Sequence, residues 1–254
     1  MKKKIIISNW KLHGSICLLN TLLIPISKFY IKNKNISAKL VIMPPYIYLH
    51  PAKKIISNTN IELGAQNVDI NLIGAFTGET SINMLKDVGV KYVLIGHSER
   101  RKYHNEDDEV VAKKFKIVKD ANLIPILCIG ETKNDYIFNK TKEVCKNQIN
   151  KIFDVLGKSG FNNSMVAYEP RWAIGSNQIP PVDFIKKISK FIKNYILSRQ
   201  DSTEKLFYIQ YGGAVNDKNI IQLLNIDDID GFLVGSLSLS LNSFINLLKN
   251  FNHT

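Results

Sequence analysis

The sequence predicts an α/β fold, a (β/α)8 barrel of eight parallel strands inside an outer ring of helices. Eight short apolar runs each precede an amphipathic segment, and the 254 residues are the length that such a barrel needs. The alternative is a doubly wound open sheet, which usually binds a dinucleotide through Gly-x-Gly-x-x-Gly after its first strand. Here the first strand ends in Asn9-Trp10-Lys11 instead. We therefore expect one barrel domain over residues 1–254.

The predicted strands are short apolar runs bounded by polar or turn residues. They are Ile5–Ser8, Leu40–Met43, Ile61–Ala65, Tyr92–Ile95, Ile124–Ile129, Met165–Tyr168, Phe207–Tyr211 and Phe232–Val234. The predicted helices repeat apolar residues at helical spacing. They are Ile16–Ile31, Ile47–Ile56, Asn83–Val88, Asp108–Asp120, Lys142–Leu156, Val182–Leu197, Asp217–Leu224 and Ser243–Phe251.

Two of these helices have recognisable start signals. We expect Asn105 to cap the helix that begins at Asp108, with the carboxylates of residues 106–108 near its positive end. A metal site formed by these carboxylates and His104 is the alternative. Pro180-Pro181 should prepare the start of the helix predicted from Val182.

The composition limits the classes of partner. The net charge is +12, which brings nucleic acid into consideration. The lysines are scattered, however, without a basic stripe that alternates with aromatic residues, so we expect solvated helix faces and no nucleic-acid partner. No apolar run is long enough to cross a bilayer, so no membrane contact is expected. Cys17, Cys128 and Cys145 suit neither a disulfide framework nor a metal site, which favours a cytoplasmic location.

The sixth predicted strand ends in a carboxylate. Glu169 follows the apolar run at residues 165–168, and Pro170 cannot continue a sheet. The next residues, up to Gly175, read as a loop. A carboxylate held at a strand end below a movable loop is typical of a general base. The alternative is a glutamate at the strand end that faces water.

The other predicted strands also end in polar or glycine-rich segments, and in a parallel barrel these ends meet on one face. The segments are Asn9 and Lys11, Gly96–Arg101, Cys128–Thr132, Tyr211–Ala214 and Gly235-Ser236. Glycines at the ends of the last two predicted strands, Gly212-Gly213 and Gly235, allow backbone N–H groups to close on a phosphate. A lone histidine is more often structural, and Ser98 lacks the second glycine of a hydrolase nucleophile elbow. Together, a base, a neutral electrophile, a cation and an anion cradle suit proton transfer beside the carbonyl of a phosphorylated substrate.

Longer motifs surround these residues: Asn9-Trp10-Lys11-Leu12, Ala65-Gln66-Asn67-Val68, the run from Gly74 to Thr80, Gly96–Arg101, Pro125–Thr132, Tyr168–Gly175, Tyr211-Gly212-Gly213 and Gly231–Gly235. Through them the chain resembles the triosephosphate isomerase family along nearly its whole length. The resemblance implies a TIM barrel that interconverts dihydroxyacetone phosphate and D-glyceraldehyde 3-phosphate through an enediolate, in glycolysis and gluconeogenesis. It implies no metal and no cofactor. The family is itself a common illustration of acid–base tuning and lid closure.

The resemblance also implies a role for each site residue. Glu169 would be the base, His97 would polarise the carbonyl as a neutral imidazole, and Lys11 and Asn9 would stabilise the developing negative charge. The catalytic residues Asn9 and Lys11 would also bind substrate. The phosphate would be held by backbone N–H groups of Gly175, Ala214, Gly235 and Ser236. Glu99 and Cys128 would support the catalytic groups from behind.

Two further features follow from the resemblance. The segment Trp172–Gly175 would form the hinge and tip of a lid that excludes water from the enediolate. The family is a homodimer in which the loop holding Thr77-Gly78-Glu79 enters the neighbouring subunit near Lys11, and this sequence keeps that loop.

The chain departs from the family pattern at a few positions, namely His13, Arg171, Ser176-Asn177, Ala214 and Ser236. Ala214 lacks a hydroxyl that bonds the closed lid in the family. Ser236 stands where the family has glycine, and would be strained if that position needs a left-handed backbone. None of these changes removes a catalytic group. Two other readings stay open: a barrel that binds a sugar phosphate without catalysis, and a basic nucleic-acid binder.

Overall fold

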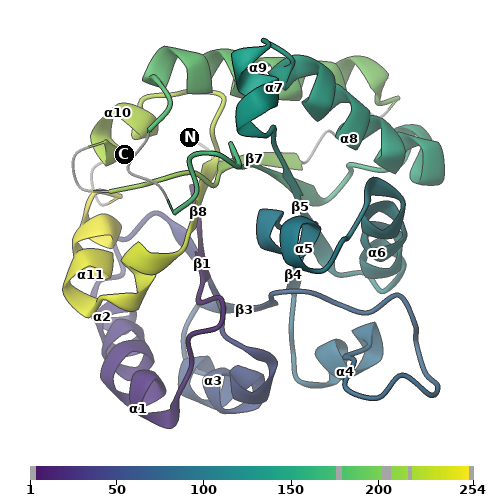
Figure 1. Cartoon of the computed structure of the whole chain (residues 1–254). Coiled ribbons are helices and arrows are strands. Elements are labelled where there is room, and N and C mark those ends of the chain that lie inside the picture. Colours follow the sequence, from purple (N-terminus) through teal and green to yellow (C-terminus); the bar gives the residue numbers. More distant parts are fainter. Residues whose placement is uncertain (1–3, 176–178, 202–206, 217–218, 252–254) are drawn as a thin grey trace.

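The computed structural model describes residues 4–175, 179–201, 207–216 and 219–251. Eight parallel strands pair in chain order, and the last pairs with the first, so the sheet is a closed barrel (Figure 1). The strands are β1 Ile5–Asn9, β2 Lys39–Met43, β3 Glu62–Ala65, β4 Tyr92–Ile95, β5 Ile124–Ile129, β6 Ser164–Tyr168, β7 Phe207–Tyr211 and β8 Gly231–Val234. The predicted fold class is confirmed, and each predicted strand is present within one residue of its expected ends.

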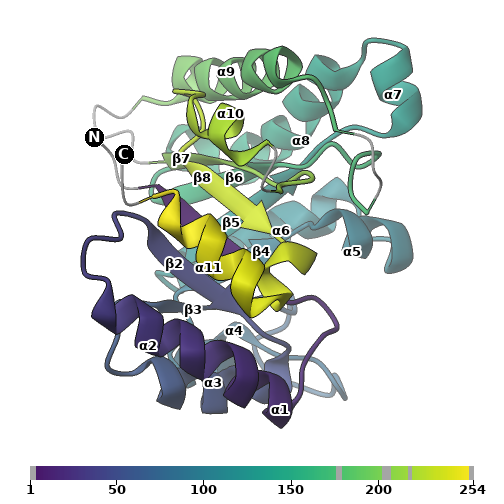
Figure 2. The same cartoon turned by 90° about the vertical axis from the view of Figure 1, so that its left-hand side faces the viewer.

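Helices surround the barrel on the outside (Figure 2). They are α1 Ile16–Leu18, α2 Ile24–Lys32, α3 Leu49–Ile56, α4 Ile82–Asp87, α5 Ser98–Tyr103, α6 Asp108–Asp120, α7 Lys133–Ile137, α8 Thr141–Leu156, α9 Val182–Arg199, α10 Ile220–Leu224 and α11 Leu241–Lys249. A π-helical turn, Leu19–Leu23, joins α1 to α2, and 3₁₀ turns lie at Tyr46–Tyr48, Gly157–Ser159 and Ser236–Leu239. Asp217, the predicted start of one helix, lies outside the described residues.

Three helix predictions need correction. The first predicted helix is divided by the π-helical turn, because Pro25 at the start of α2 has no N–H to donate to the preceding turn. Asn105 does not cap α6: its φ is +53°, and Asp107 is the cap, accepting a hydrogen bond from the amide of Val110 at 2.8 Å. The short helices α5 and α7 were not predicted. The prediction from the two prolines is confirmed, since Pro181 directly precedes α9.

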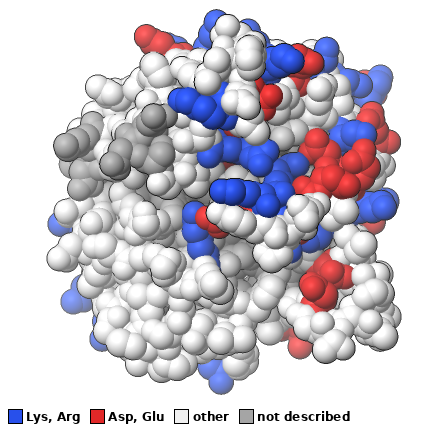
Figure 3. Space-filling model, viewed as in Figure 1, with Lys and Arg blue, Asp and Glu red and all other residues white. Residues whose placement is uncertain are grey.

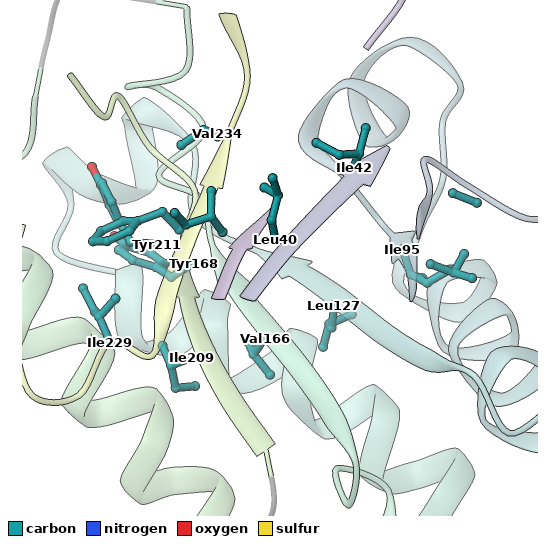
Figure 4. Packing of buried hydrophobic residues seen from close by; sticks show 14 of the residues in the cluster. Leu40, Ile42, Ile95, Leu127, Val166, Tyr168, Ile209, Tyr211, Ile229 and Val234 are labelled. Carbon is teal, nitrogen blue, oxygen red and sulfur yellow. The ribbon is translucent and has the colours of Figure 1, made fainter. Parts of the chain in front are cut away.

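The strands separate two hydrophobic layers, because successive side chains point to opposite faces of a sheet. One set, including Ile7, Val41 and Leu94, fills the inside of the barrel. The neighbouring residues on each strand pack against the helices; Leu40, Val166 and Ile209 in Figure 4 belong to this outer layer. Burial of both faces explains why the strands are nearly continuous apolar runs in the sequence.

The alternation of inward and outward side chains continues past the carboxyl ends of the strands, and it determines the direction in which the polar side chains there point. On β6, Ala167 faces the barrel interior and Tyr168 faces the helices, so Glu169 is the next inward position. On β1, Ile5 and Ile7 face inward, and Asn9 follows with the same parity. The strands that fill the core therefore also direct side chains towards the centre of one end of the barrel.

Two properties of the described chain bear on the other predictions. All three cysteines are free thiols. Within the described residues, the helices are all too short or too polar to span a membrane.

Candidate active site

A cavity of about 420 Å³ opens at the carboxyl ends of the strands. It is lined by Asn9, Lys11, His97, Glu169, Ile174, Gly175, Gly212, Gly213, Ala214, Val215, Leu233, Val234, Gly235, Ser236 and Leu237. The four predicted catalytic residues and the four predicted phosphate ligands are thus brought to one cavity. The face drawn in Figure 3 carries Lys and Arg side chains near its centre, a favourable environment for an anion.

Glu169 lies at the bottom of this cavity and is 2% exposed, so it does not face open water. Its amide donates to the carbonyl of Ile129 at 2.8 Å, which continues the pairing of β6 with β5. Gly212 makes room for the carboxylate: a Cβ there would lie 2.7 Å from Glu169 Cγ. Oε1 lies 3.4 Å from His97 Nε2 and Oε2 lies 3.5 Å from the amide of Ser98, and the thiol of Cys128 is a further hydrogen-bond partner of this carboxylate. Such contacts are weak and easily replaced.

His97 is held at the start of α5. Gly96 precedes it with φ +69°, a conformation that favours glycine, and a Cβ there would also crowd Val111 at 2.9 Å. The imidazole Nδ1 accepts a hydrogen bond from the amide of Glu99 at 3.3 Å. Because Nδ1 accepts, the ring proton of the neutral imidazole lies on Nε2, which points towards Glu169.

Lys11 has a strained backbone with φ +53°, and neighbouring amide groups hold it there. The Asn9 Oδ1 accepts from the amide of Lys11 at 2.9 Å. The Gln66 Nε2 donates to the carbonyls of Lys11 and Met43, both at 2.9 Å. Since Asn9 uses its oxygen in this way, its side-chain NH2 group stays available as a donor on the cavity wall.

Glu99 connects the cation to the imidazole. Its Oε1 lies 2.6 Å from Lys11 Nζ, and its Oε2 lies 3.6 Å from His97 Nδ1. A single carboxylate therefore fixes the position of the ammonium group and stands behind the imidazole.

Cys128 lies inside the barrel below Glu169 and is 1% exposed. Burial, with the negative charge of Glu169 as a second cause, raises the pKa of its thiol well above the usual value. The thiol therefore stays protonated, and Cys128 acts as a small packing group beneath the carboxylate.

Another part of the cavity wall is formed by backbone, and it reaches Lys11, because a Cβ at Gly235 would lie 3.3 Å from Lys11 Cε. None of the amide groups of Gly175, Ala214, Gly235 and Ser236 donates a hydrogen bond to another described residue. Amide groups that face a cavity without a partner form an anion site. Ser236 is not among the residues with positive φ, so the strain expected for a non-glycine residue there is absent.

The segment after Glu169 is anchored to Glu131. Trp172 Nε1 donates to Glu131 Oε1 at 2.8 Å, and the amide of Arg171 donates to the Glu131 carbonyl at 3.1 Å. The Tyr168 hydroxyl adds a hydrogen bond to the same carboxylate at 3.1 Å. Burial raises the pKa of Glu131, while the hydrogen bond from Trp172 opposes that shift. The departures at Ser176-Asn177 fall outside the described residues.

Two positioning residues, Gln66 and Glu131, had no role in the sequence-based prediction. Both directly follow the end of a strand or come two residues after it, which is the signal that would have found them. Their contacts are made to backbone or to side chains far along the chain, so this place at a strand end indicates the residues but not their partners. Among the described residues, no group of three His, Cys, Asp or Glu side chains gathers in a way that could hold a metal ion. Ser98 approaches Glu169 through its amide.

Comparison with known proteins agrees with this geometry. Residues 4–251 match the family model described as triosephosphate isomerase. The chain is 67% identical over 251 residues to the triosephosphate isomerase of Buchnera aphidicola subsp. Baizongia pistaciae, covering 98% of this chain and 100% of that protein. It is 48% identical over 251 residues to that of Buchnera aphidicola subsp. Cinara cedri, with 98% of each chain covered. It is 47% identical over 250 residues to that of Wigglesworthia glossinidia brevipalpis, with 97% and 95% covered.

Proposed function

Because the chain belongs to the triosephosphate isomerase family, we propose that it interconverts dihydroxyacetone phosphate and D-glyceraldehyde 3-phosphate. The observation that carries this proposal is the contact of Glu169 Oε1 with His97 Nε2 at 3.4 Å at the bottom of a cavity whose wall is partly backbone amide. One part offers a base and a hydrogen-bond donor, and another offers an anion site. That pairing suits a short carbonyl compound with a terminal phosphate.

In the proposed mechanism, Glu169 removes a proton from the carbon next to the carbonyl. The electron pair of the C–H bond moves to the carbonyl oxygen and gives an enediolate. The hydroxyl oxygen on the first carbon then gives up its proton and the oxyanion takes one up, both through His97 Nε2, while Glu169 returns a proton to the neighbouring carbon. The isomerisation is thereby completed without a net change in atoms or electrons. The long contacts of its carboxylate leave it able to turn towards a substrate C–H group.

Three groups stabilise the enediolate. His97 donates from Nε2 to the developing oxyanion, since its Nδ1 is occupied by the amide of Glu99. The Asn9 NH2 group is a second donor, and the Lys11 ammonium supplies a positive charge on the cavity wall. No step in this scheme requires a metal or a cofactor.

The phosphate binds to the amides of Gly175, Ala214, Gly235 and Ser236, and the segment Trp172–Gly175 forms part of a lid over the bound substrate. Closing the lid removes water and so strengthens each electrostatic contact with the enediolate. It also keeps the intermediate from eliminating its phosphate.

The direct test is an isomerase assay with glyceraldehyde 3-phosphate, coupled through glycerol-3-phosphate dehydrogenase to NADH oxidation. We expect turnover that disappears in a Glu169→Gln variant with unchanged substrate binding. A wild-type protein that binds the triose phosphate without turnover would instead support a sugar-phosphate-binding barrel. Salt-dependent retention on DNA or RNA would support the nucleic-acid alternative.

The chain is also proposed to form a homodimer through the loop that holds Thr77-Gly78-Glu79. All of residues 72–79 are exposed, including Ile73 at 91%, and Figure 1 shows the connection from β3 to α4 extending outward from the barrel. A second cavity of about 460 Å³ lies beside Lys11, Glu99 and Tyr103 and is a suitable receptor for this loop from a partner. An exposed apolar surface around that cavity, with Leu12 at 96%, favours an interface.

Deletion of Thr77-Gly78-Glu79 tests this assembly. The change leaves the cavity with Glu169 and His97 intact, so we expect a folded monomer with little isomerase activity, because Lys11 loses the support of the partner loop. Sedimentation velocity and the coupled assay measure the two effects. A monomer with full activity would contradict the proposal.

We place the enzyme in the cytoplasm. Cys17, Cys128 and Cys145 are all free thiols, the state that a reducing compartment maintains, and an enzyme of glycolysis acts there.

A further inference from the structure

The helix α7 contacts the lid segment through side chains whose role is not explained by the proposed mechanism. Tyr136 lies against Trp172 with ring centroids 4.4 Å apart and an angle of 33° between the planes. Lys133 Nζ lies 4.5 Å from the centroid of the Trp172 ring and 5.5 Å from that of Tyr136. Trp172 is therefore in contact with an aromatic ring and with a cation of the same helix.

Tyr136 is itself fixed by the helix behind it. Its ring meets Phe184 of α9 edge to face, with centroids 5.1 Å apart and the planes at 90°. Figure 1 shows α7 beside α9. A continuous set of contacts thus runs from α9 through Tyr136 to Trp172.

The backbone transmits the position of Trp172 to the cavity. The amide of Ala173 donates to the carbonyl of Pro170 at 2.8 Å, which closes a turn, and Ala173 is fully buried. Gly175 follows Trp172 by three positions, a span of at most about 11 Å. Ile174 and Gly175 line the cavity in the arrangement that these contacts hold.

Arg171 adds an electrostatic contact to the same helix. Hydrogen bonds from Thr132 are the main cause of a lowered pKa at Asp135, and the charges of Lys140 and Arg171 lower it further. Arg171 is half-buried next to Trp172. The ring contacts, and not this charge, carry the position of the hinge.

We propose that Tyr136 and Lys133 are positioning residues for the lid, which hold Trp172 in the orientation that places the Gly175 amide over the phosphate end of the cavity. This inference rests on the proposed function in one respect, that the lid acts in isomerisation. Removing the Tyr136 ring should let the hinge move and take Gly175 away from the phosphate. Affinity for the triose phosphate then falls, and the intermediate is less protected.

The experiment compares Tyr136→Leu with two matched controls. Tyr136→Phe keeps the ring, and Phe138→Leu removes an exposed ring from the end of the same helix without a contact to Trp172. Acrylamide quenching of tryptophan fluorescence reports on Trp172, because Trp10, the other tryptophan, is fully buried. This measurement needs no substrate, so it tests the contact even if the chain proves not to isomerise trioses.

For Tyr136→Leu we expect faster quenching, a KM raised roughly two- to tenfold and a similar increase in phosphate released per isomerisation. Both control variants should match the wild type in quenching rate, KM and phosphate released per isomerisation. If circular dichroism shows that Tyr136→Leu does not fold, Lys133→Gln should give the same changes at about twofold. If the folded Tyr136→Leu variant is quenched at the wild-type rate, the proposal that Tyr136 holds Trp172 is wrong. Raised quenching with unchanged KM and phosphate release would overturn its role in holding the lid.

Discussion

The two ends of the active-site cavity are built from different parts of the chain. At the carbonyl end, the part proposed to meet the substrate carbonyl, the groups are side chains, and two of them are fixed by a partner: Lys11 by Glu99 at 2.6 Å and His97 by an amide at 3.3 Å. At the phosphate end, the part proposed to bind phosphate, the groups are backbone amides, such as those of Gly235 and Ser236.

This difference explains where the sequence departs from its family. The departures that line the cavity, Ala214 and Ser236, both lie at the phosphate end. A backbone amide survives a change of side chain as long as φ and ψ are kept, and Ser236 has no positive φ that would demand glycine. The carbonyl end would have no such freedom, because in the proposed mechanism the reacting atoms belong to the side chains.

The largest effect should come from shortening the base. Glu169→Asp withdraws the carboxylate by one methylene, and a displacement of that size can cost on the order of 100-fold. The loss should fall on kcat, since the phosphate contacts are kept and KM changes little. Steady-state kinetics in the coupled assay measure both constants. A variant with wild-type kcat would show that the carbonyl end does not depend on Glu169.

A smaller effect should follow from weakening a support of the carbonyl end. Gln66→Met keeps the size of the side chain but leaves the carbonyl of Lys11 without its donor, whereas that of Met43 keeps the amide of Trp10. An unmade hydrogen bond costs about 1–3 kcal/mol, so kcat/KM should fall roughly tenfold as Lys11 relaxes from its strained backbone. Gln66→Glu also lacks the N–H donor and should lose at least as much activity. Unchanged kinetics in the methionine variant would mean that Asn9 alone fixes Lys11.

The smallest effect is expected at the phosphate end. Ala214→Ser supplies a hydroxyl that can bond a closed lid, and one neutral hydrogen bond contributes roughly 0.5–1.5 kcal/mol. The phosphate released per isomerisation should therefore fall, by about tenfold at most. Ser236→Gly is the control, and it should leave that ratio unchanged because the backbone there is already relaxed. An equal decrease in both variants would mean that phosphate-end flexibility, not the hydroxyl, limits the leak.

The barrel was predictable because each strand is buried on both faces and therefore stands out as a short apolar run. The strand ends were found to within a residue for the same reason. The helices were less well defined. Whether Asn105 or Asp107 caps α6 depends on a turn with positive φ, and the π-helical turn before α2 depends on the neighbours of Pro25. Neither feature has a periodic signal.

The sequence predicted that the candidate site residues lie at strand ends. It did not predict the residues that hold them in position. Gln66, which follows β3, donates a hydrogen bond to the carbonyl of Lys11, which follows β1. Glu131, in the loop after β5, accepts a hydrogen bond from Trp172, in the loop after β6. Tyr136 meets Trp172 only because α7 folds, and a five-residue helix is too short to show a period. Contacts between distant segments are the part of the site that sequence patterns leave open.

The alternation of inward and outward side chains on β6 has a consequence for how such a protein can change. Inserting or deleting one residue in this strand would turn Glu169 towards the helices and Tyr168 towards the barrel interior, so core and catalysis would be lost together. Changes of chain length are therefore confined to the connections between strands and helices. A lineage, or a designer, can lengthen the connections that carry no proposed function, while each strand keeps its number of residues.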